Sequence, residues 1–178
     1  MVNLSPPKKV KLLCGFIYKE ESIYLSVKKI IKQKLGEIDY ESEKLNFNFT
    51  DYYYEEIGKP LWRRFISLKK LSSPSASKLV KMKLWCIKVE KKFSLNNKRQ
   101  INIDPGYLNL ARLVLLTTKD FSHRIYLEKG IYAEVTLHYS HSNYNDFVWT
   151  YPDYRTKEYK NIFLKVRQIY KAQLKDEK

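Results

Sequence analysis

The stretch Val10–Gly36, VKLLCGFIYKEESIYLSVKKIIKQKLG, decides how the chain begins to fold. Apolar residues occupy alternate positions up to Tyr18, and several positions between them are apolar too, which predicts a strand buried at least partly on both faces. Glu20 and Glu21 suit the positive N-terminus of a helix. Apolar residues then recur at spacings of three and four until the glycine that ends the helix.

The segments that follow extend this unit to the order strand-helix-strand-strand-helix-strand. Strands are predicted at Leu45–Phe49, Phe65–Leu68 and Gln100–Asp104. Between the last two, Ser72–Ser75 provides capping residues for a helix whose apolar stripe runs over Leu79–Phe93. This order is the split pattern of ferredoxin-like domains.

The second half adds strands and one more helix. Strands are predicted at Leu113–Thr118, Arg124–Leu127 and Ile131–Tyr139, the last two joined by the short loop Glu128–Gly130, and Thr156 caps a final helix. We therefore predict an α+β fold: a mixed or antiparallel sheet with three main helices, in which a ferredoxin-like first half is extended by a hairpin.

Length and composition limit the class of protein. The 178 residues contain no visible repeat or linker, which predicts a single domain over residues 1–178. No apolar run is long enough to cross a membrane, and no secretory signal is recognisable. Cys14 and Cys86 lie on apolar stripes and lack zinc-ligand spacing, so they are predicted to be core residues in a reducing cytoplasm.

The charge favours an anionic partner, but weakly. The sequence contains 34 Lys and Arg residues and 19 Asp and Glu residues, which gives a net charge of +15. The excess is mostly lysine and mostly in the first 100 residues, where it falls on predicted helices whose charged faces are commonly just solvated. Nucleic acid or a phosphate-bearing ligand is the expected partner.

Four segments combine charge, aromatic rings and turn residues near strand ends, where small-molecule sites are often built. They are Phe49–Tyr53, Asn102–Tyr107, Thr117–Tyr126 and Trp149–Arg155.

The predicted hairpin places two of these side chains. If its three-residue loop pairs Leu127 with Ile131, Arg124 lies opposite Glu134, and Tyr126 lies opposite Tyr132 on the same face. His123 then points to the other face. The charged pair is either a cross-strand ion pair or an anion clamp in which the glutamate orients the arginine.

The segment Asp104-Pro105-Gly106 is predicted to close a strand with a turn. The carboxylates of Asp51, Asp104, Asp120, Glu134 and Asp153 are numerous enough for a magnesium site, although such acids also cap turns.

The same segments resemble the bacterial domain-of-unknown-function family 4416. The resemblance rests on Phe49–Tyr53, Asp104–Leu108, Thr117–Asp120, His123–Leu127 and Gly130–Leu137, together with Trp149–Arg155, and covers nearly the whole chain. It implies a bacterial cytoplasmic protein of about this length. It carries no established activity and transfers no functional residue.

Two functions remain open at this stage. The first is a binding module for a phosphate-bearing ligand or RNA. Its binding residues are Asp51, Tyr52, Tyr53, Arg63, Arg64, Lys119, Arg124, Tyr126, Asp153 and Arg155. The alternative is a metal-assisted hydrolase acting on a phosphorylated substrate, with magnesium as its cofactor. Its catalytic groups are Asp104, Asp120, His123 and Glu134. An interaction or assembly protein is a third reading, marked by an apolar surface patch.

Overall fold

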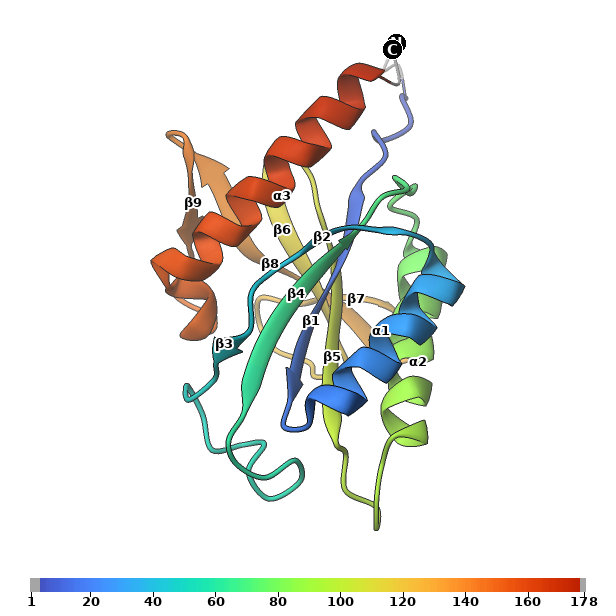
Figure 1. Cartoon of the computed structure of the whole chain (residues 1–178). Helices are drawn as coiled ribbons and strands as arrows, with labels where there is room; N and C mark the ends of the chain where they lie inside the picture. Colours follow the sequence, from blue (N-terminus) through green and yellow to red (C-terminus); the bar gives the residue numbers. More distant parts are fainter. Residues whose placement is uncertain (1–3, 177–178) are drawn as a thin grey trace.

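The computed structural model describes residues 4–176, which form one antiparallel sheet flanked by helices (Figure 1). The strands along the sheet follow the order β2-β4-β1-β5-β6-β8-β7; β3 pairs with β4, and β9 with β8. The strands are β1 (Lys11–Tyr18), β2 (Ile38–Glu41), β3 (Leu45–Asn46), β4 (Trp62–Leu68), β5 (Ile101–Leu108), β6 (Arg112–Thr117), β7 (Ile125–Glu128), β8 (Ile131–Ser140) and β9 (Asn143–Asp146). The helices are α1 (Glu21–Leu35), α2 (Ala76–Lys92), the short 3-10 helix η1 (Asp153–Arg155) and α3 (Lys157–Asp176).

The first half has the predicted split topology. Strands β5, β1, β4 and β2 are neighbours in that order, and each adjacent pair is antiparallel. The helices α1 and α2 are the two crossovers of this unit. The α+β prediction with a ferredoxin-like first half is therefore confirmed, and β6 to β9 widen the sheet beyond β5.

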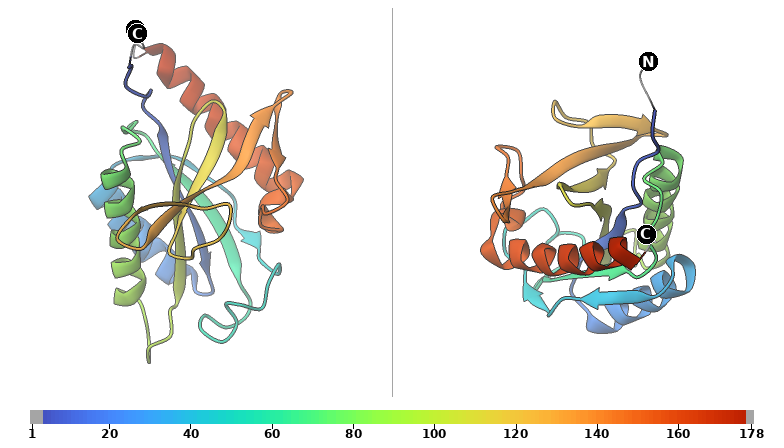
Figure 2. Two further views of the ribbon diagram at one scale, coloured as in Figure 1. Left: turned by 180° about the vertical axis from the view of Figure 1, so that it is seen from behind. Right: turned by 90° about the horizontal axis from the view of Figure 1, so that it is seen from above.

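The two faces of the sheet are covered by different helices. Figures 1 and 2 show α1 and α2 together on one side and α3 on the other. The first face buries side chains such as Cys14 and Phe16 against Val27 and Cys86. Neighbouring positions of the same strands, Leu13 among them, turn to the opposite face and pack against α3.

Local sequence signals set the helix ends. Gly36 follows α1 with a φ of 109°, and its N–H donates to the Lys32 carbonyl. The Ser75 hydroxyl accepts the Lys78 N–H at 3.3 Å, as an N-cap does. Thr156 plays the same part for α3, since its hydroxyl accepts the N–H of Tyr159.

The β7–β8 hairpin has a shorter loop than predicted. Glu128 pairs with Ile131, so Lys129 and Gly130 alone form the turn, both with positive φ, as a two-residue type I′ turn requires. A bulge before Glu128 then restores the register. Tyr126 lies opposite Tyr132 as predicted, and the centres of their rings are 5.3 Å apart.

The prediction of a turn at Asp104-Pro105-Gly106 is wrong, because these residues continue β5. Asp104 pairs with Gly15, and Pro105 pairs with Cys14 of β1. Gly106 has no positive φ. The local turn signal is overridden by pairing with β1 along the full length of the strand.

Three further differences concern short strands. The predicted strand Leu45–Phe49 is reduced to β3, and β2 and β9 were not predicted. Both unpredicted strands are short and largely polar, so they lack the alternating pattern that identifies a strand.

Cys14 and Cys86 are buried free thiols, as predicted. None of the helices within residues 4–176 is long and apolar enough to cross a membrane.

Candidate functional site

A cleft opens where β5 and β6 separate. The two strands pair only from Gly106 to Leu108 on β5, opposite Leu113 to Leu115 on β6. At the fork, a Cβ on Gly106 would lie 2.2 Å from the Val114 carbonyl oxygen. Only glycine permits this close approach of the two strands. The part of β5 that precedes Gly106 has no β6 residue paired with it.

The edge of β5 that faces the cleft is closed by side chains from α2. Lys83 Nζ donates to the Ile103 carbonyl at 3.0 Å, and the Ile103 N–H donates to Glu90 Oε1 at 2.6 Å. Alternate residues point their backbone groups to this edge, so the next one after Ile103 is Pro105. Proline has no N–H group and therefore needs no acceptor there. Side chains thus replace the missing neighbouring strand, and a buried ammonium and carboxylate come to line the cleft.

The cleft is a cavity of about 1070 Å³. All four segments singled out in the sequence contribute to its wall, although their lining residues span the chain from Phe49 to Tyr154. Their lining residues are Phe49, Thr50, Tyr52 and Tyr53; Asn102 and Asp104; Thr117, Thr118 and Lys119; and Tyr151, Pro152, Asp153 and Tyr154.

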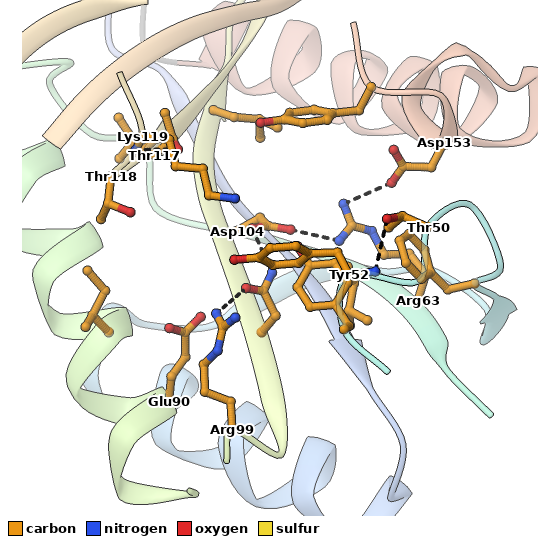
Figure 3. A pocket seen from close by; sticks show the side chains of 18 of the residues that line it. Thr50, Tyr52, Arg63, Glu90, Arg99, Asp104, Thr117, Thr118, Lys119 and Asp153 are labelled. Atoms are coloured by element: carbon orange, nitrogen blue, oxygen red, sulfur yellow. Dashed lines mark hydrogen bonds and ion pairs between the residues drawn. The ribbon is translucent and has the colours of Figure 1, made fainter. Parts of the chain in front are cut away.

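Arg63 is the central cation of the floor. Its side chain is 1% exposed, and one terminal nitrogen donates to Asp104 Oδ2 at 2.8 Å. The other donates to the Tyr154 hydroxyl at 2.7 Å and lies 3.6 Å from Asp153 Oδ2 (Figure 3). The guanidinium therefore neutralises two carboxylates that project toward the cavity from β5 and from the segment before α3.

The two carboxylates respond differently to this arginine. Burial acts to raise the pKa of Asp104, but the charges of Arg63 and Lys83 outweigh it, and its pKa is lowered. Asp153 is more remote from the guanidinium, and burial raises its pKa. The Asn102 amide also donates to Asp104 Oδ1 at 2.8 Å, which fixes this carboxylate further.

A second buried group lies on the β8 side. Glu134 is 1% exposed, and its Oε2 accepts the Arg124 Nε–H at 2.9 Å. His123 Nε2 lies 3.0 Å from the same oxygen, so the prediction that His123 points to the other face is wrong. This histidine precedes β7 in a turn, where strand alternation does not apply. Trp149 stacks on its ring at 5.1 Å.

Arg124 connects this group to the loops of the cleft. Beyond Glu134, it donates to the Lys119 carbonyl at 3.0 Å and to the Tyr151 hydroxyl at 2.7 Å. Burial raises the pKa of Tyr151 to about 12. Arg124 itself is not part of the cavity wall, so its contacts hold wall residues in place.

Tyr52 and Lys119 meet at the mouth. The Lys119 ammonium lies 4.2 Å from the centre of the Tyr52 ring, which is the distance of a cation–π contact (Figure 3). Tyr52 is 56% exposed and packs edge-on against Tyr53 at 4.9 Å. Lower on the same side, Arg99 is held by Glu56 and donates to the Asn102 side chain.

The predicted site residues separate into three groups. Asp104, Glu134, Tyr52, Tyr53, Arg63, Lys119 and Asp153 line the cleft. His123 and Arg124 lie behind the wall on Glu134. Asp51, Asp120, Arg64, Tyr126 and Arg155 do not line it.

The outlying residues have visible structural roles or are exposed. Arg64 turns to the α1 face, where it binds Tyr18 and Glu21. Arg155 donates to the carbonyls of Thr150 and Val148, and so holds its own loop. Asp51 and Asp120 are exposed, as is Tyr126.

Of the five carboxylates expected for a magnesium site, those of Asp104, Glu134 and Asp153 line the cleft, and those of Asp51 and Asp120 do not. Across residues 4–176, no three or more His, Cys, Asp or Glu side chains form a group that could hold a metal ion. Asp104 and Asp153 share a guanidinium, and Glu134 is bonded to Arg124.

Sequence reasoning missed Lys83, Glu90 and Arg99. The first two are seven positions apart on a helix, which places them on one face beside the apolar stripe. That spacing was the available signal for a shared site, but charged residues on the exposed face of a helix commonly have the same spacing. Their burial depends on β6 leaving the edge of β5, which no local pattern encodes.

Comparison with known proteins agrees with the resemblance of the sequence segments. A search of curated proteins and a search of solved structures give no match. The model of a family described as a domain of unknown function, DUF4416, matches residues 8–170, which include every wall residue of the cleft. The chain therefore belongs to the DUF4416 family.

Proposed function

We propose that the protein is a binding module for a small phosphate-bearing molecule, which it holds in the cleft between β5 and β6. The observation that carries this proposal is the distribution of ion pairs on the wall. Arginines neutralise the carboxylates of Asp104, Asp153 and Glu134. Within residues 4–176, the lysines at the mouth of the cleft have no such carboxylate partner.

Lys119 and Lys91 supply the available positive charge. Both are exposed cavity residues, and neither forms a salt bridge with any residue between 4 and 176. An ammonium with three free donors is well suited to a phosphate oxygen. Thr117 and Thr118 line the same cavity, where their hydroxyls add neutral donors, and the Thr117 hydroxyl also accepts the Lys119 N–H at 3.2 Å.

The size of the cleft supports a small ligand. A volume of about 1070 Å³ lies at the upper end of the range for pockets that hold one small molecule. Many of the remaining lysines, such as Lys81 and Lys88, are exposed on α2 but are not part of the cavity wall. They contribute long-range attraction for anions, which salt screens.

Isothermal titration calorimetry with inorganic phosphate and ribose 5-phosphate tests the proposal. Both should bind, and Lys119→Ala should weaken binding by about tenfold, since a hydrogen bond to a charged group contributes about 1.5–3 kcal/mol. Lys88→Ala is the matched control, because it removes an equal charge from α2 outside the cavity wall. Its affinity should stay within about twofold of the wild type at 0.15 M salt.

Two results contradict the proposal. One is an absence of binding for both probes at millimolar concentration. The other is an equal loss of affinity in Lys119→Ala and Lys88→Ala, which would mean that the net charge, and not the cleft, attracts the anion.

A further inference from the structure

The cleft presents different charges at different depths. Lys119 and Lys91 are exposed at the mouth. Deeper in, the carboxylates of Asp153 (side chain 9% exposed) and Glu90 (5% exposed) lie on the wall together with the buried cations Arg63 and Lys83. A ligand whose anionic group occupies the mouth therefore meets both buried acceptors and buried donors at its other end.

The deep carboxylates retain acceptor capacity. The Asp153 carboxylate lies 3.6 Å from Arg63 and also accepts the backbone N–H groups of Asp153 and Tyr154, which leaves part of its acceptor capacity unused. Glu90 uses Oε1 for the Ile103 N–H, and its Oε2 has no bond to these residues. Ring N–H and amino groups are suitable donors to such oxygens, as in the recognition of cytosine by Asp and Glu.

The arginine that approaches Asp153 also has an unused donor. Arg63 Nε is a buried N–H without a hydrogen-bond partner in residues 4–176. Buried donors of this kind are normally satisfied, so an acceptor from a ligand or a water is expected there. The same guanidinium lies near Asp153. A ligand edge that carries a donor next to an acceptor would complete both groups.

Aromatic side chains occupy the space between floor and mouth. Those on the wall are Phe47, Phe49, Tyr52, Tyr53, Tyr151 and Tyr154. Tyr52 is the most exposed of these aromatic side chains, ahead of Phe49 and Tyr151. The Lys119 ammonium already lies over one face of its ring. A flat heterocycle can replace this cation on the ring and release the lysine to the phosphate.

We propose that the ligand is a nucleoside phosphate, bound with its base toward Asp153, Glu90 and Arg63 and its phosphate at Lys119. This inference rests on the proposed function and names the class of its ligand. A cavity of about 1070 Å³ accommodates such a molecule, whereas inorganic phosphate or a sugar phosphate would leave the aromatic wall and the deep carboxylates unused.

The test compares ligands that differ by the base alone. Ribose 5-phosphate, the four ribonucleoside 5′-monophosphates and a single-stranded hexaribonucleotide are titrated calorimetrically against the full chain. At least one mononucleotide should bind ten times more tightly than ribose 5-phosphate. Tyr52→Leu should lower the ratio of mononucleotide affinity to ribose 5-phosphate affinity by about tenfold, because stacking on one aromatic ring accounts for an effect of that size.

Two further variants make the test specific. Asp153→Asn should lower the ratio of mononucleotide affinity to ribose 5-phosphate affinity by about fivefold or more, since it alters an acceptor for the base. Tyr126→Leu is the matched control for Tyr52→Leu. It removes an equally exposed tyrosine outside the cleft and should change neither affinity.

The outcomes separate this inference from the proposed function. If ribose 5-phosphate binds as tightly as every mononucleotide, the nucleotide assignment fails while phosphate binding stands. If the hexaribonucleotide binds more than tenfold more tightly than any mononucleotide, the ligand is single-stranded RNA, and the assignment is again wrong. If none of the probes binds, both proposals fail.

Discussion

Arg63 on β4 reaches over Gly15 of β1 to bond Asp104 on β5, and so ties three adjacent strands together at the floor of the cleft. Gly15 is paired with Asp104 and leaves open the space that the guanidinium crosses. A Cβ at this glycine would lie 3.3 Å from Arg63 Cζ and 3.0 Å from the Phe65 ring.

Removal of this arginine should destabilise the fold strongly. Arg63→Met keeps much of the volume but leaves Asp104 and Asp153 without their shared cation. Breaking a buried ion pair from one side costs about 3–5 kcal/mol. Urea unfolding at pH 7 measures the loss. Arg112→Met, which removes an exposed arginine, should cost less than about 1 kcal/mol. Equal stability of the two variants would contradict the central role of Arg63.

Replacement of Asp153 should increase the stability of the fold at neutral pH, whereas replacement of Arg63 decreases it. Its folded-state pKa is raised by burial, so the folded protein holds this proton more tightly than the unfolded chain. Below the usual Asp pKa of about 3.9, both states are protonated and the group has no effect. Above it, the unfolded chain ionises first, and stability falls as the pH rises through the raised pKa.

The variant Asp153→Asn cannot ionise and avoids this loss. Its stability relative to the wild type should therefore increase between pH 3 and pH 7, as followed by urea unfolding across that range. Asp104→Asn is the contrasting variant, because the pKa of Asp104 is lowered in the fold. Asp104 contributes stability above pH 4 that is lost in acid, so this variant should be most destabilised at pH 7. A parallel pH dependence in the two variants would refute the assignment.

Two glycines allow a graded test of the sheet geometry. Gly15→Ala brings its Cβ against side chains, which can shift, and overpacking of that kind costs about 1–3 kcal/mol. Gly106→Ala places its Cβ 2.2 Å from a backbone oxygen of β6, which can move only if the strands separate. We expect Gly106→Ala to be the more destabilising by urea unfolding. The reverse order would show that the fork between β5 and β6 is less tightly packed than its geometry indicates.

Sequence reasoning reached the parts of the fold that depend on local chemistry. Gly36 and Ser75 set helix ends as predicted, and Arg124 meets Glu134 as the hairpin register required. The continuation of β5 through Pro105 was missed, because the turn propensity of Asp-Pro-Gly is local while the pairing with β1 is not.

The same distinction holds for the site. Four segments were selected because each combines charge with aromatic rings, and each contributes to the cleft. Lys83 and Glu90 were missed, since nothing within α2 shows that a strand edge opposite them lacks a partner. His123 was placed on the wrong face because strand periodicity was extended into a turn.

The ion pair behind the wall should show energetic coupling. Arg124→Met leaves the buried Glu134 carboxylate with His123 and Thr136 as its remaining partners and should cost about 3 kcal/mol or more. In the double variant Arg124→Met/Glu134→Gln no buried charge remains, so the cost should be smaller than the sum of the two single changes. A double-mutant cycle by urea unfolding measures this coupling. Strict additivity would show that the two groups act independently.

The α2 clamp on Ile103 can be observed at a single amide. Glu90→Ala removes the acceptor of the Ile103 N–H and leaves a buried donor unsatisfied, which costs about 1–3 kcal/mol. Because this amide faces the fork and not β1, its hydrogen exchange should accelerate by tenfold or more, beyond the change at amides that bond β1. Glu90→Gln retains an acceptor oxygen and should restore most of the protection. If all β5 amides accelerate equally in Glu90→Ala, the effect is global destabilisation and Glu90 does not specifically protect the strand edge.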